Sequence, residues 1–235
     1  MKKGIILSAF ILSTIVFAGF SSGQSVVTET RDVKGFTKVS FGVSGNLYIN
    51  IGPEFKVTVE GDKSTLDDIL TEVSGGRLVI KKDNWRLNQN EKVTVTITMP
   101  ELNGLGVSGS GRAEIREAVK TSELSLSVSG SGKLFATELV LSNLDCSISG
   151  SGDIIIGGEG KVTSADISIS GSGNYTGEQL KIGSADISIS GSGNCTCNVT
   201  ESLKGSVSGS GNVTYFGNAA RVDTRVSGSG HVRSR

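Results

Sequence analysis

The stretch SADISISGSGN occupies residues 164–174 and recurs without a change at residues 184–194. Its Gly-Ser-Gly ending belongs to a longer series, in which each copy begins 18 to 21 residues after the one before. The copies begin at Gly109, Gly130, Gly150, Gly171, Gly191, Gly209 and Gly228. A nearly fixed period of this length is typical of a solenoid, in which each repeat is one structural unit stacked on the last.

Apolar and small polar residues alternate within each copy. In the second stretch, Ile187, Ile189, Cys195 and Cys197 share one parity, and Ser, Asn and Thr fill the other. Successive side chains of a strand point to opposite sides, so the apolar parity predicts a core and the polar parity a surface. One such repeat cannot bury its apolar side alone. The pattern therefore predicts a parallel β-helix of about 20 residues per coil, with an antiparallel meander as the competing arrangement.

Two interpretations of the Gly-Ser-Gly motif stay open. Both glycines fall on the inward parity, which is expected where the backbone approaches another wall of the coil and leaves no room for a side chain. Alternatively, the motif is a bend in which one glycine has a positive φ. The apolar residues keep their register across the motif, and this favours the first interpretation.

The chain divides by composition into three segments. Residues 1–23 carry two lysines, an apolar run and then small residues, a pattern typical of a cleaved signal peptide. The pattern predicts export to the periplasm, the outer surface or the medium, with no membrane span after removal of the signal. Residues 24–105 hold less regular strands and a polar loop around Trp85, and residues 106–235 hold the repeats. We expect 24–235 to form one continuous domain.

One short helix is expected near the N-terminal end of an otherwise all-β fold. Ser64 is a good N-cap residue, and Asp67 follows three positions later. An apolar stripe at helical spacing comes next: Leu66, Ile69, Leu70 and Val73. The pair Gly75-Gly76 is expected to end this helix.

Composition and motifs exclude several function classes. Lys and Arg number 23, as do Asp and Glu, so no net field favours nucleic acid. The chain has three cysteines and one histidine; Cys146, Cys195 and Cys197 fall on the inward parity and are expected in the core rather than in a disulfide or zinc site. The motifs of serine hydrolases, dinucleotide-binding folds and P-loops are missing from the sequence. We therefore predict no catalytic residue, metal or cofactor.

Carboxylates that could serve a polysaccharide-cleaving enzyme are scattered among the repeats. Asp166 and Asp186 occupy the same slot in adjacent repeats, and a stacked coil would bring them close together. Catalysis requires a cluster of acids on one face, with a base or a metal. A solvated edge is the interpretation that we favour for this pair.

Five residues are candidates for binding. Asn174, Asn194 and Asn212 follow directly after Gly-Ser-Gly, and stacked Asn side chains can hydrogen-bond along the axis of a coil. The same slot holds Lys133 and Asp153, which would form an exposed ion pair. Trp85 and Arg86 lie in a polar loop, where an exposed Trp could contact a sugar or a partner protein. Alternatively, Trp85 folds back over the first coil.

Four segments carry a resemblance to a known family. They are Arg31-x-Val-x-Gly-Phe-x-x-Val39, the pair Gly61-Asp62, VTVTITMPEL at residues 93–102 and VSGSG at residues 107–111. Over about residues 30–220 the chain resembles the putative auto-transporter adhesin, head GIN domain family. The resemblance implies a right-handed, exported bacterial β-helix without established catalytic residues.

Together these features predict an exported, non-enzymatic β-solenoid of the cell surface or envelope. We expect an adhesin or binding module, and its partner would be a glycan or a cell-surface protein. A structural or assembly module of the envelope, working as a homo-oligomer, is one alternative. A polysaccharide-active β-helix enzyme is another.

Overall fold

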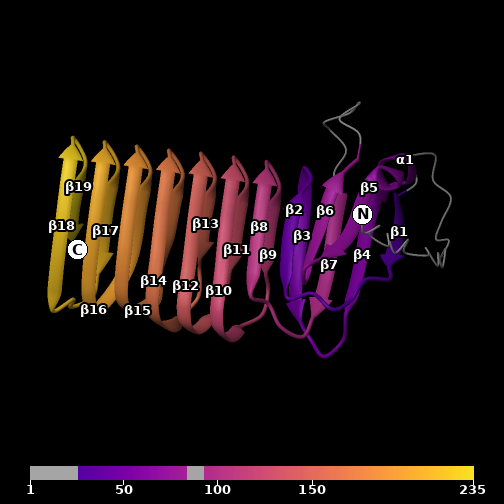
Figure 1. Cartoon of the computed structure of the whole chain (residues 1–235), viewed down its shortest axis with the longest axis horizontal. Coiled ribbons are helices and arrows are strands. Elements are labelled where there is room, and N and C mark those ends of the chain that lie inside the picture. Colours follow the sequence, from indigo (N-terminus) through magenta and orange to yellow (C-terminus); the bar gives the residue numbers. More distant parts are fainter. Residues whose placement is uncertain (1–25, 84–92) are drawn as a thin grey trace, which may run out of the picture.

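The computed structural model describes residues 26–83 and 93–235, which form an elongated β-solenoid with almost no helix (Figure 1). All strands belong to one sheet of 19 strands. In chain order the elements are β1 (Val26–Arg31), β2 (Lys38–Gly42), β3 (Gly45–Ile51), β4 (Lys56–Asp62), α1 (Lys63–Asp67), β5 (Ile69–Ser74), β6 (Arg77–Lys82), β7 (Val93–Met99), β8 (Gly104–Gly109), β9 (Arg112–Ile115), β10 (Val119–Gly130), β11 (Lys133–Ala136), β12 (Leu139–Gly150), β13 (Asp153–Ile156), β14 (Gly160–Gly171), β15 (Asn174–Gly191), β16 (Asn194–Gly209), β17 (Asn212–Phe216), β18 (Arg221–Gly228) and β19 (His231–Ser234).

Each coil of the repeat region has a longer stretch of strand that ends at the first glycine of Gly-Ser-Gly and a shorter stretch that begins just after the second. Adjacent coils pair in parallel and in register, so that Ile167 lies beside Ile187 and Gly171 beside Gly191. Figure 1 shows the coils side by side along the rod as far as β18 and β19. The predicted parallel β-helix of about 20 residues per coil is therefore confirmed, and the antiparallel meander is wrong for the repeats.

The core lies inside the coils, as the alternation predicted. Ile187, Ile189 and Cys195 are almost completely buried, whereas Ser188 and Ser190 between them are exposed. The inward parity continues across Gly-Ser-Gly without a shift. Each coil therefore contributes a thin apolar layer that only its neighbours can cover, and the stacking of coils supplies the hydrophobic stabilisation.

The two interpretations of Gly-Ser-Gly are both partly right. The first glycine of every copy has a positive φ, from 87° at Gly109 to 126° at Gly191, so the motif is a bend. The close approach is also real, because a Cβ on Gly193 would lie 2.4 Å from the oxygen of Gly173. Our preference for a strand without a bend was wrong for the first glycine. It failed because this bend preserves the inward parity.

The helix that we expected from Ser64 to the glycine pair is much shorter. The helix α1 ends at Asp67, and β5 then forms an antiparallel hairpin with β6. Gly75 and Gly76 have φ values of 56° and 72°, which suit a two-residue hairpin turn. The apolar residues after Asp67 match a strand as well as a helix, and the β-branched Ile69, Thr71 and Val73 fit the alternation of a strand.

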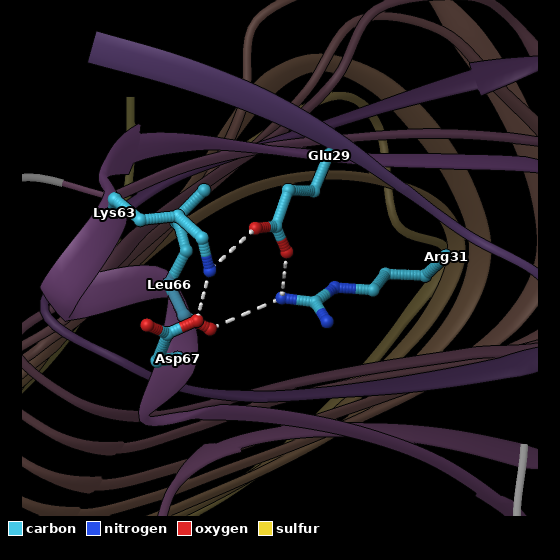
Figure 2. A network of polar contacts seen from close by, with 5 residues as sticks. All are labelled: Glu29, Arg31, Lys63, Leu66 and Asp67. Atoms are coloured by element: carbon cyan, nitrogen blue, oxygen red, sulfur yellow. Dashed lines mark hydrogen bonds and ion pairs between the residues drawn. The ribbon is translucent and has the colours of Figure 1, made fainter. Parts of the chain in front are cut away.

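A cap of antiparallel strands and α1 covers the N-terminal end of the rod. The strand β4 pairs antiparallel with β1 and β7. Figure 2 shows how α1 is tied to β1: the Glu29 carboxylate lies 2.9 Å from the Arg31 guanidinium and 3.3 Å from Lys63 Nζ. Arg31 also donates to the carbonyl oxygen of Leu66 at 3.1 Å, and Lys63 pairs with Asp67. These contacts fix the short helix over the first coils.

Candidate functional site

The short strands present two outward columns of side chains along the rod, and we call their surface the short-strand face. The column directly after Gly-Ser-Gly runs Arg112, Lys133, Asp153, Asn174, Asn194 and Asn212. Two residues further on, the second column runs Glu114, Phe135, Ile155, Thr176, Thr196 and Thr214. Because the register is parallel and regular, every coil contributes one residue to each column.

A hydrogen-bonded ladder runs through the first column. Asn212 Nδ2 donates to Asn194 Oδ1 at 3.0 Å, and Asn194 Nδ2 donates to Asn174 Oδ1 at 3.0 Å. Asn174 Nδ2 in turn donates to Asp153 Oδ1 at 2.9 Å, and Lys133 Nζ lies 2.8 Å from Asp153 Oδ2. The predicted Asn ladder and the predicted Lys–Asp pair are thus confirmed as structural features.

The ladder leaves binding capacity unused. A side-chain amide has two N–H donors and an oxygen with two lone pairs. Asn174 and Asn194 each use one donor and one lone pair within the ladder. One donor and one lone pair of each remain for a molecule that lies along the face. Their orientation is fixed in advance by the ladder.

Asp153 is the one carboxylate of the ladder. Burial would raise the pKa of its carboxyl group, but hydrogen bonds from Lys133 and Asn174 outweigh that effect, and the net pKa is lowered from its ordinary value of 3.8. The group is therefore ionised at neutral pH. Because both of its oxygens already have partners, it is a structural charge rather than a poised acid or base.

An arginine–aromatic cluster occupies the end of the short-strand face nearest the N-terminal cap. The Arg112 guanidinium carbon lies 3.7 Å from the centre of the Phe135 ring, and that of Arg116 lies 3.7 Å from the centre of the Tyr48 ring. Glu114 lies between the two arginines, 3.9 Å from Arg112 and 3.8 Å from Arg116. Tyr48, Glu114 and Phe135 are neighbours on three adjacent coils. These five residues form the cluster.

A hollow of about 350 Å³ opens beside the cluster. Phe135 and Ile155 give it an apolar floor, although they lie on the outward parity where later coils carry threonine. Gly157 and Gly158 form its rim at the corner of the coil. A Cβ on Gly158 would lie 2.0 Å from the oxygen of Thr137, so the backbone here comes too close for any side chain. Gly157 leaves the space at this corner open, because a Cβ there would meet nothing within 4 Å.

The binding residues that the sequence suggested are only partly placed by the structure. Trp85 and Arg86 lie outside the described residues. Asn174, Asn194 and Asn212 lie on the same face as the hollow, further along the rod, and whether they bind a ligand stays a prediction. Sequence reasoning missed the hollow. The available sign was the pair of apolar residues, Phe135 and Ile155, at outward positions.

The remaining ionisable groups are placed as follows. Asp145, Asp166 and Asp186 lie in register on the outer side of the long strands, and Lys204 pairs with Asp186 at 2.7 Å. The cysteines are buried and unbridged, as expected of core residues.

Within residues 26–83 and 93–235, no set of three or more His, Cys, Asp or Glu side chains is arranged to hold a metal ion. The same part of the chain contains no helix with the length and apolar character needed to cross a membrane.

Comparison with known proteins places the chain in a family. The family described as putative auto-transporter adhesin, head GIN domain, matches residues 35–219. The chain belongs to this family. The resemblance inferred from the sequence is therefore confirmed. A search of the curated proteins found no match.

Solved structures of similar proteins share the fold of this family member. A putative adhesin from Bacteroides fragilis NCTC 9343 is 27% identical, with a TM-score of 0.86; the match covers 92% of this chain and 100% of that one. A putative adhesin from Parabacteroides distasonis ATCC 8503 is 23% identical, with a TM-score of 0.73 and coverage of 90% and 97%. A putative lipid binding protein from the same organism is 22% identical, with a TM-score of 0.68 and coverage of 89% and 96%. The family and two of these relatives are described as putative adhesins, and the third as a putative lipid binding protein; none of these descriptions names an enzyme.

Proposed function

We propose that the protein is an exported, non-enzymatic binding module of the cell surface that recognises a glycan along its short-strand face. The observation that carries the proposal is the rigid double column of Asn and Thr side chains that leads to the hollow. The family's description as an adhesin supports a role in attachment. The signal-like residues 1–23 support export.

The chemistry of the face suits a polysaccharide. Amides and hydroxyls repeat along the axis at about 4.8 Å, the spacing of neighbouring strands. The free N–H and lone pair of Asn174 and Asn194, with the hydroxyls of Thr176 and Thr196, match the donors and acceptors of sugar hydroxyls. The ladder holds the amides in place before a ligand arrives, which reduces the entropy lost on binding. A repetitive ligand can therefore contact several coils at once.

A catalytic role has little support on this face. Glycoside hydrolysis needs two carboxylates, one of which must donate or accept a proton. Asp153 is held by Lys133 and Asn174, and Glu114 lies between two arginines. The environment of Asp153 favours the ionised carboxylate and lowers its pKa, so this group is not suited to act as a general acid at neutral pH.

A glycan array probed with the full chain tests the proposal, with surface proteins tested separately by pull-down. We expect at least one glycan to bind, and Thr196→Val combined with Asn194→Ala to weaken that binding by about tenfold, as expected when hydrogen bonds to a ligand are lost. The matched control, Ser168→Ala with Ser188→Ala, removes two exposed hydroxyls of the long strands and should leave binding unchanged. Silence of the array, capture of a protein ligand alone, or equal losses in both double variants would contradict the proposal.

A further inference from the structure

We propose that the hollow beside the arginine–aromatic cluster binds a carboxylated sugar residue, so that the glycan recognised by this face is acidic. The inference rests on the proposed glycan-binding function and adds the chemical class of the ligand. Three features carry it: an uncompensated charge in the cluster, the oriented guanidinium group of Arg112 that lines the hollow, and an apolar floor.

The charge of the cluster is incomplete. Two other cations of the coils each have their own carboxylate from an adjacent coil: Lys133 pairs with Asp153 at 2.8 Å and Lys204 with Asp186 at 2.7 Å. Arg112 and Arg116 instead share Glu114, at 3.9 Å and 3.8 Å. These distances are longer than a hydrogen bond. Two positive charges and one negative charge leave a net charge of +1, which one carboxylate of a ligand would neutralise.

Arg112 lines the hollow and is oriented to receive that carboxylate, and Arg116 adds its charge from the other side of Glu114. Each lies over an aromatic ring at 3.7 Å, so its plane is supported by Phe135 or Tyr48. A stacked guanidinium keeps its N–H donors at its edges, where they match the two oxygens of a carboxylate. In the described part of the chain, the side chains of these arginines form no hydrogen bond. Their donors are available to a ligand.

The floor of the hollow suits the body of a sugar ring. Phe135 and Ile155 stand in the column where Thr176, Thr196 and Thr214 stand on later coils. Sugar rings have apolar C–H faces as well as hydroxyls, and an apolar floor covers such a face. The volume of about 350 Å³ lies at the lower end of the usual range for small-molecule sites. A single carboxylated ring is therefore a suitable occupant.

The test measures affinity by isothermal titration calorimetry with the full chain. The probes are short oligosaccharides that end in glucuronate, galacturonate or a nonulosonate, each beside its carboxyl-reduced form, which is matched in its rings but neutral. We expect at least one acid to bind about tenfold or more tightly than its reduced form, the difference expected for a charge-assisted bidentate contact. Added salt should reduce the difference.

Variants locate the effect. Arg112→Gln should remove most of the preference for the acid, and so should Arg112→Lys, which keeps the charge but loses the planar fork. Arg116→Gln, outside the lining of the hollow, should remove a smaller part. Arg221→Gln, on the exposed strand β18, changes net charge equally and should change nothing. Phe135→Thr places in the hollow the residue that later coils already carry, so the fold should tolerate it, and binding of both forms should weaken.

The outcomes separate this inference from the proposed function. Equal binding of acids and reduced forms, or an acid preference that survives Arg112→Gln and Arg116→Gln, would overturn the carboxylate site and leave glycan binding standing. Binding of no glycan on the array would overturn both. An acid preference that Arg221→Gln removes as fully as Arg112→Gln would show a general charge effect and would also overturn the site.

Discussion

The carbonyl oxygen of Gly171 accepts a hydrogen bond from the amide of Ser192, one coil further along the rod, at 2.8 Å. The same relationship links Gly150 with Ser172 at 2.8 Å. The bends therefore lie directly on one another, backbone to backbone. From Gly130 onward, the glycines of the motif satisfy two demands at once, a positive φ at the first position and a close approach at both.

Alanine at these glycines should destabilise the protein. A Cβ on Gly191 would lie 2.3 Å from the oxygen of Gly171, and one on Gly193 would lie 2.6 Å from Ile169 Cγ2. We expect Gly191→Ala and Gly193→Ala each to lower the free energy of unfolding by about 1–3 kcal/mol or more, through overpacking. Gly157→Ala is the control, because its Cβ would meet nothing within 4 Å. Urea unfolding checks this; a loss at Gly157→Ala as large as at Gly193→Ala would contradict it.

The Asn ladder should contribute to stability one rung at a time. Asn194 donates to Asn174 and accepts from Asn212, so Asn194→Ala removes two hydrogen bonds. We expect a loss of about 1–2 kcal/mol in the free energy of unfolding, since each net hydrogen bond contributes roughly 0.5–1.5 kcal/mol. Ser188→Ala, which removes an exposed hydroxyl of the same coil, should have little effect. If the two variants unfold at the same urea concentration, the ladder does not stabilise the fold.

Acid should weaken the contribution of Asp153. Its folded pKa is lower than its ordinary value of 3.8, because hydrogen bonds from Lys133 and Asn174 outweigh the opposing effect of burial. The ionised carboxylate therefore stabilises the fold above about pH 3.8, and this contribution is lost as pH falls through the lower folded pKa. In Asp153→Asn this part of the acid sensitivity should be missing. Thermal unfolding of both proteins, measured from about pH 6 down to about pH 2.5, would show this difference. If the melting temperatures of the two proteins fall in parallel with pH, the prediction is wrong.

The three thiols should be inert in the folded protein. Burial raises the pKa of the Cys146 thiol, and the hydrogen bond with Cys197, together with burial, raises that of Cys195. The reactive species is the thiolate, so a thiol reagent at about pH 8 should label the native chain very slowly and all three cysteines after unfolding. The variant Ser188→Cys places a thiol at an exposed position and should react at once. Rapid native labelling of the unmodified chain would show that the interior is open.

Tyr175 offers a test of the core. Its ring is completely buried, and its hydroxyl has no hydrogen-bond partner among the described residues. Gly177 leaves room for it, since a Cβ there would lie 2.7 Å from the hydroxyl oxygen. Tyr175→Phe removes an unsatisfied polar group, so stability should stay the same or rise by about 1 kcal/mol. A clear loss in melting temperature would mean that the hydroxyl has a partner after all.

Sequence reasoning predicted the repeat region well because one physical rule governs it. The alternation of Ile187 and Ile189 with serine is unambiguous, and the fixed period favours stacked coils over an antiparallel meander. The same rule could not decide the segment after Asp67, where Ile69 and Val73 fit one face of a helix and also one face of a strand. There the outcome depends on pairing with β6, which a local pattern does not contain.

The candidate site was predictable only in part, for a related reason. The Asn ladder follows from in-register stacking, so the sequence was enough to predict its hydrogen bonds. The arginine–aromatic cluster combines Tyr48 with residues of two later coils, and Tyr48 lies in a segment without a clear Gly-Ser-Gly motif. The pairing of Tyr48 with Glu114 joins residues that are distant in sequence. Only the coil geometry shows that they share one surface.

The line of stacked bends has a consequence for how such a protein can change its length. A further 20-residue unit can be inserted between two existing ones without any new turn, and the unchanged repetition of residues 164–174 at 184–194 fits growth by duplication. Each insertion would extend the reach of the molecule by about 4.8 Å. The hollow, built by β9, β11 and β13, would keep its shape while its distance from the far tip is adjusted. Spacing and recognition are thus separable properties in this architecture.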